Sequence, residues 1–170
     1  MTTSNDLIEF HSISQLKFRY VRALDTHDWE LMERCLTENA FAWFSGGKFK
    51  QQGRRQIVAF LRELIPASLV SSHIVVHPEL TLTGPSTAKG IWRMQDIIYF
   101  IEPNPVFAHG NIEGGEEMTG AAYYHEEYEK SGDEWQISSI GFVRIFEVIE
   151  RKRARAHIDL TVEPARGMRR

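Results

Sequence analysis

The chain has 170 residues, of which 42% are hydrophobic and 11% aromatic, and this length suits one ordinary domain with a substantial core. Its 20 basic and 23 acidic residues leave a net charge of -3, which gives no general attraction to nucleic acid or to an anionic membrane. We therefore expect one domain at residues 1–150, followed by a short basic tail at 151–170, with neither a nucleic-acid nor a membrane partner.

The sequence also predicts the compartment. The first residues lack the basic and then apolar order of a signal peptide, and no apolar run approaches the roughly 18 residues that span a bilayer. Cys35 is the only cysteine, so the chain cannot form an internal disulfide. We expect a cytoplasmic protein.

Two helices are predicted near the start of the chain. Spacings of three and four give the first helix its apolar stripe, formed by Ile13, Leu16, Tyr20 and Leu24. Asp28 suits the N-cap of the second helix, whose apolar side begins at Trp29 and continues through Met32, Cys35 and Leu36. Asp25 lies between the two helices and is not needed to cap either of them.

The rest of the chain predicts one further helix and then strands. Residues 41–50 read as a hairpin turning at two glycines, and residues 54–65 return to helical periodicity before Pro66. β-Branched and alternating patterns then predict strands at 69–76, 88–101, 120–130 and 135–148. Helices followed by an antiparallel meander indicate an α+β fold, and the polar 102–118 segment suits a lid or a pocket rim.

Two opposite charges interrupt apolar strand faces. Asp96 alternates with residues such as Trp92, and Arg144 shares a side with Phe142, Phe146 and others of its strand. Charges on the apolar faces of one sheet suggest a pair. A buried structural ion pair and a functional pair explain this pattern about equally well.

His73, Asp25 and Tyr20 each have an ordinary explanation when taken alone: a core histidine, a helix-end residue and a packed aromatic. Together they have the chemistry for proton abstraction, because histidine accepts a proton near neutral pH and a carboxylate can hold its tautomer. The other histidines lack metal-ligand spacing, and no glycine-rich phosphate loop follows a strand. We expect neither a metal nor a cofactor.

The sequence resembles the SnoaL-like branch of the NTF2-like superfamily over residues 13–147. The similarity lies in the segment from Tyr20 to Asp25 with Trp29, the pair Ser72-His73, the stretch from Gly90 to Asp96, and the segment from Gly141 to Glu147. Within this branch the chain is most similar to bile-acid 7α-dehydratase and to scytalone dehydratase-type enzymes. Phe44 stands where the bile-acid enzymes have a tyrosine.

The resemblance implies a cone in which a curved, mostly antiparallel sheet wraps around N-terminal helices and leaves an apolar pocket, in a chain that assembles as a homotrimer. It assigns the catalytic positions to Tyr20, Asp25, His73, Asp96 and Arg144. Aromatic contacts to substrate would come from Phe44, Trp92 and Phe142.

These expectations favour a cofactor-free dehydratase acting on a cyclic, mostly apolar hydroxy-ketone, such as a steroid or aromatic polyketide. His73 would move the proton, Asp25 would orient it, and Tyr20 would donate a hydrogen bond to the carbonyl oxygen. Asp96 and Arg144 would form the opposite wall. Two alternative functions stay open. The protein could be an isomerase that uses the same site, or a non-catalytic binding protein or small subunit of a ring-hydroxylating dioxygenase.

Overall fold

The computed structural model describes residues 3–107 and 112–151. This part of the chain holds helices α1 (Ser4–Asp25), α2 (Trp29–Cys35) and α3 (Arg54–Leu64), with a short 3-10 turn, η1 (Ser45–Gly47). Its strands are β1 (Leu36–Phe44), β2 (Phe49–Gln52), β3 (Leu69–Gly84), β4 (Thr87–Phe100), β5 (Glu116–Ser131) and β6 (Glu134–Arg151). From residue 152 onward the predicted basic tail lies outside the described residues.

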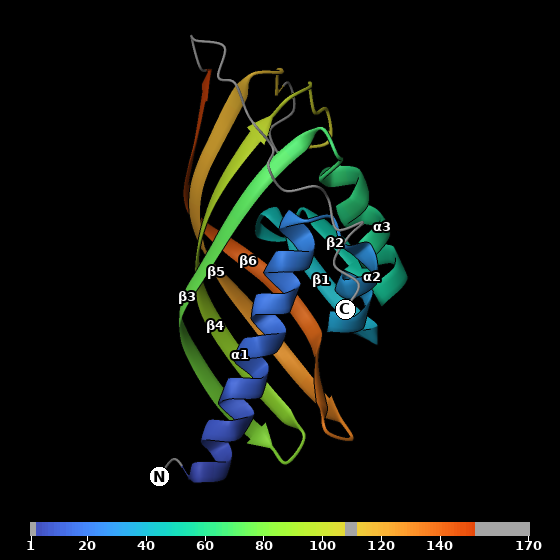
Figure 1. Ribbon diagram of the computed structural model, residues 1–170, viewed down its shortest axis with the longest axis vertical. Coiled ribbons are helices and arrows are strands. Elements are labelled where there is room, and N and C mark those ends of the chain that lie inside the picture. Colours follow the sequence, from blue (N-terminus) through green and yellow to red (C-terminus); the bar gives the residue numbers. More distant parts are fainter. Residues whose placement is uncertain (1–2, 108–111, 152–170) are drawn as a thin grey trace.

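The strands form one curved sheet in the order β2-β1-β6-β5-β4-β3, and the helices lie on its concave side (Figure 1). From β3 to β6 the strands make the predicted antiparallel meander. β1 and β2 form the predicted hairpin, but β1 joins β6 in parallel, so the sheet is mixed. The α+β cone expected from the sequence is confirmed.

Local sequence explains where the first two helices begin. Thr3 and Asp6 form a capping box at the start of α1, several residues before the predicted stripe. The carboxylate of Asp28 accepts from the backbone N–H of Leu31 at 3.0 Å, which confirms it as the N-cap of α2. Leu36, assigned to this helix by periodicity, is instead the first residue of β1.

One strand departs from simple alternation. β6 carries a bulge, because Ala122 pairs with Arg144 whereas the preceding Ala121 pairs with Phe146. A bulge inserts one residue and reverses the facing of everything beyond it. Phe146 and Val148 were predicted to share the side of Arg144, which is wrong: both are 48% exposed. Glu147 takes the position beside Arg144 instead.

The core lies between α1 and the concave face of the sheet. Its largest fully buried side chains include Trp92, Tyr20 and Tyr128, together with Lys17. Within the described residues, no helix combines the length and the hydrophobicity that crossing a bilayer requires.

Candidate active site

The end of α1 lies against the start of β3, and this contact joins Asp25 to His73. Asp25 Oδ1 lies 2.6 Å from His73 Nδ1, and Oδ2 accepts from the His73 backbone N–H at 2.9 Å. Ser71 Oγ also donates to Oδ1, at 2.8 Å. Three hydrogen bonds therefore fix the carboxylate and orient the imidazole, whose side chain is only 5% exposed.

An ion pair crosses the sheet from β4 to β6. Arg144 donates from both terminal nitrogens to the two Asp96 oxygens, each at 2.6 Å, and its Nε lies 3.4 Å from Glu147 Oε2. Burial acts to lower the pKa of Arg144, but the hydrogen bonds and charge of Asp96 outweigh it, so that pKa lies above its ordinary value. The guanidinium stays charged.

Gly120 makes this crossing possible. It is the register partner of Asp96 in β5, the strand between the two charged residues. A Cβ at this position would lie 2.6 Å from Arg144 Nη1 and 2.8 Å from Asp96 Oδ1. Only a residue without a side chain leaves room for the pair to pass over the strand.

Two phenols accompany these charges. Tyr20 on α1 is 1% exposed and Tyr124 on β5 is 3% exposed. Burial, with the nearby charge of Glu126, raises the pKa of Tyr20 far above its usual value, and burial also raises that of Tyr124. Both phenols are therefore neutral hydrogen-bond donors across the physiological pH range.

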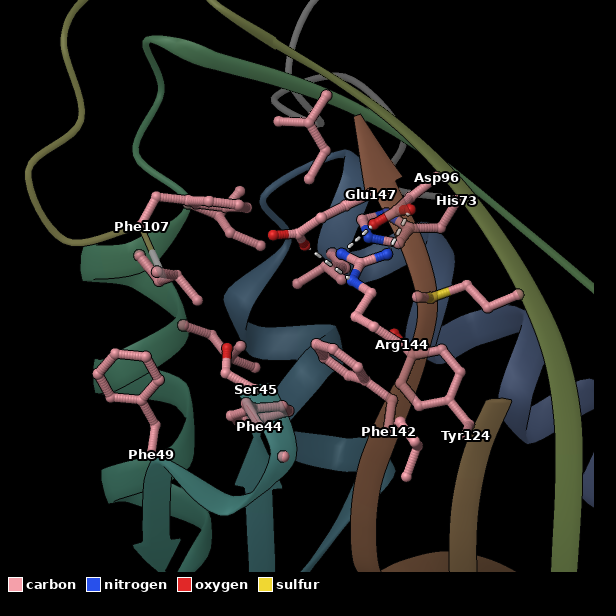
Figure 2. A pocket seen from close by; sticks show the side chains of 18 of the residues that line it. Phe44, Ser45, Phe49, His73, Asp96, Phe107, Tyr124, Phe142, Arg144 and Glu147 are labelled. Carbon is pink, nitrogen blue, oxygen red and sulfur yellow. Dashed lines mark hydrogen bonds and ion pairs between the residues drawn. The ribbon is translucent and has the colours of Figure 1, made fainter. Parts of the chain in front are cut away.

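Six of these residues line one cavity of about 710 Å³: Tyr20, His73, Asp96, Tyr124, Arg144 and Glu147. This volume falls within the range of small-molecule sites. Figure 2 shows the polar groups of His73, Asp96, Arg144 and Glu147 gathered together, with phenylalanine rings across from them. The apolar part of the lining includes Leu24, Phe44, Phe49, Leu61, Leu64, Ile65, Met94, Ile98, Phe107 and Phe142.

The segment before β5 contributes to the cavity rim. Phe107 lines the cavity and packs edge-on against Phe100, with ring centroids 5.1 Å apart. Asn104 holds this turn, because its side chain accepts from the backbone N–H groups of Val106 and Phe107 and donates to Leu64 O. The described part of the predicted 102–118 segment thus forms a rim, and the segment is shorter than expected since β5 begins at Glu116.

The structure brings most of the candidate residues together. Tyr20, His73, Asp96 and Arg144 line the cavity, and Asp25 lies directly behind His73. Of the aromatic residues, Phe44 and Phe142 also line it. Trp92 does not: its indole is fully buried in the core, where Nε1 donates to Tyr128 Oη at 2.8 Å.

The sequence did not single out Tyr124 and Glu147, which line the cavity, or two buried charged residues outside its lining. Lys17 is fully buried and forms an ion pair with Glu126, whose second oxygen accepts from the Tyr128 hydroxyl. Burial lowers the pKa of Lys17, and Glu126 works against that shift. Patterns in the sequence did mark both residues, because Lys17 shares the apolar stripe of α1 and Glu126 alternates with Tyr124 and Tyr128.

The arrangement suits acid–base chemistry on an apolar molecule. A neutral imidazole that donates from Nδ1 to Asp25 keeps an acceptor lone pair on Nε2. The phenols and the guanidinium supply donors within the same water-poor space. In the described part of the chain, no group of three or more His, Cys, Asp or Glu residues is placed to hold a metal ion.

Comparisons with known proteins agree with this architecture. A protein of Gibberella zeae named "Probable cyclase FGR4" is 23% identical over 146 residues, covering 79% of this chain and 89% of the relative. Among solved structures, a candidate scytalone dehydratase from Novosphingobium aromaticivorans superimposes with a TM-score of 0.72 at 14% identity, covering 95% of this chain and 99% of that one. Hexachlorocyclohexane dehydrochlorinase LinA-type3 from Novosphingobium barchaimii gives 0.72 at 15% identity, with 90% and 95% covered.

The family follows from a longer match. Residues 6–140 match the SnoaL-like domain, which is most of the chain. The structural neighbours share the curved sheet and the helices that pack on it. The chain therefore belongs to the SnoaL-like family of the NTF2-like superfamily.

Proposed function

We propose that this protein is a cofactor-independent dehydratase that removes water from a cyclic, largely apolar hydroxy-ketone. The observation that carries the proposal is the 2.6 Å contact between His73 Nδ1 and Asp25 Oδ1 at the wall of an apolar cavity. This contact holds the imidazole in the tautomer whose Nε2 can accept a proton.

The reaction begins with transfer of a carbon-bound proton, α to the ketone, to His73 Nε2. The electron pair of the broken C–H bond moves into the carbonyl, and Tyr20 donates a hydrogen bond to the oxygen as enolate charge develops. The enolate then re-forms the carbonyl and a carbon–carbon double bond while the β-hydroxyl leaves. The imidazolium returns its proton to the departing hydroxide, so one molecule of water is lost and no oxidant is needed.

Asp25 and the Asp96–Arg144 pair have supporting roles in this proposal. Asp25 orients His73 and stabilises the imidazolium between the two proton transfers. Arg144 and Asp96 lie on the same polar wall as His73, not opposite it as expected from the sequence, because Asp96 is the register partner of His73; in this proposal they bind a polar group of the substrate. Phe44 and Phe142, whose ring centroids are 6.0 Å apart, contact the apolar rings of the substrate.

Two further observations support elimination chemistry. The cavity lining is mostly hydrocarbon, which suits a steroid-sized or polyketide-sized ring system rather than a sugar or a nucleotide. Two structural neighbours are a dehydrochlorinase and a candidate dehydratase, names that both denote elimination.

The test is a screen of steroid and aromatic polyketide hydroxy-ketones by mass spectrometry. The wild type should produce a species lighter by one water, and His73→Ala should lower that rate by about 10²-fold or more, the usual contribution of a general base. His11→Ala is the matched control, because His11 is exposed on α1 and does not line the cavity. Unchanged turnover in His73→Ala would refute the mechanism, and a double-bond shift without mass loss would assign an isomerase instead.

The protein is further proposed to be a homotrimer. Apolar side chains from β3, β4 and β6 are about half exposed on the sheet; these are Ile74, Ile97, Val143 and Ile145. We call these four residues the outer apolar patch. Exposed apolar side chains of this kind mark contact with another protein surface, and in a ring of three copies this patch would pack against a different surface of the neighbouring copy.

A further inference from the structure

The hydroxyl groups of Tyr20 and Tyr124 stand out among the polar groups of the cavity. Both side chains line the cavity and are at least 97% buried, and no hydrogen bond joins either hydroxyl to a described residue. Neither oxygen is among the fully buried atoms that lack a partner, so both hydroxyls are open to the cavity, where a ligand can accept from them. Two such donors facing one cavity indicate that its ligand supplies an acceptor.

The guanidinium of Arg144 is largely engaged. Each of its three nitrogens faces a carboxylate oxygen, two from Asp96 and one from Glu147, which occupies three of its five N–H groups. The two phenols therefore offer a ligand oxygen donors that no ion pair holds.

Lys17 lies directly behind both phenol rings. Its Nζ is 3.4 Å from the ring centroid of Tyr124 and 4.8 Å from that of Tyr20. Glu126 holds the ammonium there, and Glu126 is held in turn by Tyr128, whose hydroxyl accepts from Trp92. The cavity lining does not include these four residues, which are Lys17, Glu126, Tyr128 and Trp92. They therefore act on a ligand through the two phenol rings.

We propose that Tyr124 joins Tyr20 to form an oxygen-binding subsite, and that Lys17 is a positioning residue which fixes both rings and places positive charge behind them. The inference rests on the proposed function and extends it: Tyr124 becomes a second catalytic donor to the oxygen on which enolate charge develops. Donors fixed in advance stabilise that charge without reorganising during the reaction. A cation against the ring faces is held by the π electrons and adds a favourable field.

The test uses two probes of nearly equal shape, 2-naphthol and 2-methylnaphthalene, titrated by fluorescence. The ratio of their dissociation constants reports contacts to the oxygen and cancels contacts to the rings. Wild type should prefer 2-naphthol. Tyr124→Phe should weaken binding of 2-naphthol by about three- to tenfold, the worth of one neutral hydrogen bond, and leave 2-methylnaphthalene unchanged.

Adjacent residues supply matched controls. Tyr123→Phe removes the same hydroxyl from the exposed side of β5 and should leave the ratio at its wild-type value. Lys17 is tested with the double variant Lys17→Met/Glu126→Gln, because removal of Lys17 alone would strand a buried carboxylate. Its control is Lys89→Met/Glu127→Gln, which removes an exposed pair of 2.9 Å. Circular dichroism melting establishes that each variant is folded.

The Lys17 double variant should lower the preference for 2-naphthol, whereas the Lys89 double variant should not. On a hydroxy-ketone that the wild type dehydrates, Tyr124→Phe should lower kcat more than it changes KM. The subsite is refuted if wild type binds both probes equally or binds neither, or if Tyr124→Phe weakens both probes alike. An unchanged ratio in the folded Lys17 double variant would refute the role of Lys17. Since the probes undergo no reaction, these outcomes are independent of whether dehydration is found.

Discussion

Gly120 leaves the space through which Arg144 reaches Asp96: a Cβ on the glycine would lie 2.6 Å from Arg144 Nη1. The charged residues come from strands on either side of β5, so their bond must pass over its backbone. Gly120, which has no side chain, thus decides whether the ion pair between Asp96 and Arg144 can form.

Gly120→Ala should destabilise the protein and displace the pair. Overpacking a tight site costs about 1–3 kcal/mol, and here the crowded atoms belong to a buried bidentate ion pair. Urea unfolding should show a lower free energy of unfolding than wild type. Thr119→Ala, on the exposed side of the same strand, is the control and should stay close to wild type. Equal stability of the two variants would contradict this account.

Asp25→Asn should abolish most activity while keeping the fold. An asparagine amide can donate to His73 Nδ1, which places the ring proton on Nε2 and removes the acceptor that the mechanism needs. We expect kcat to fall by about 10²–10⁴-fold, the range for general-base catalysis. Asp133→Asn, in the exposed turn before β6, serves as the control. Wild-type turnover by a folded Asp25→Asn protein would exclude His73 as the base in this form.

Phe142 and Trp92 should respond differently to mutation, although the sequence suggested a substrate contact for both. Phe142→Ala removes a wall of the cavity and should raise KM with a smaller effect on kcat. Trp92→Phe removes a buried donor to Tyr128 and should lower the melting temperature with little change in KM. Steady-state kinetics and thermal melting of the two variants provide the comparison, and a large KM effect in Trp92→Phe would contradict it.

Stability should fall at alkaline pH, in part through Cys35. Burial raises the pKa of the Cys35 thiol from 9.0 to about 11, so the unfolded chain ionises first. The contribution of this thiol is fully present below pH 9 and is lost as the pH rises toward 11, with a total on the order of 3 kcal/mol. Urea unfolding at pH 8 and at pH 10.5 should show a smaller decrease for Cys35→Ala than for wild type. Equal decreases would contradict the assignment.

The outer apolar patch should control assembly. Light scattering after gel filtration should give the wild type about three times the chain mass of 19.7 kDa. Ile97→Glu puts a charge at the patch and should yield a monomer, because burying an unpaired carboxylate is costly. Gln15→Glu, on the exposed side of α1, should leave the mass unchanged. A monomeric wild type, or an Ile97→Glu protein of unchanged mass, would contradict the trimer.

Local patterns in the sequence were enough for the elements and for most of the polar groups of the site. The α1 stripe placed Tyr20 inward, Asp28 marked the start of α2, and alternation put Asp96 and Arg144 on the concave face. These features depend on a residue and its near neighbours, since helix phase, capping and strand alternation are set over a few positions.

Only the tertiary structure decided how those groups meet. The bulge in β6 brought Glu147 beside Arg144 and left Phe146 half exposed at the edge of the cavity, and Trp92 lies in the core rather than the cavity. The pair of Lys17 and Glu126 shows this most clearly. A charged residue within an apolar stripe has no explanation from the local sequence until its partner, 109 residues away, is known. A charge can be buried only where a partner of opposite charge lies beside it in the fold. The sequence contains both residues of such a pair but does not show that they are in contact.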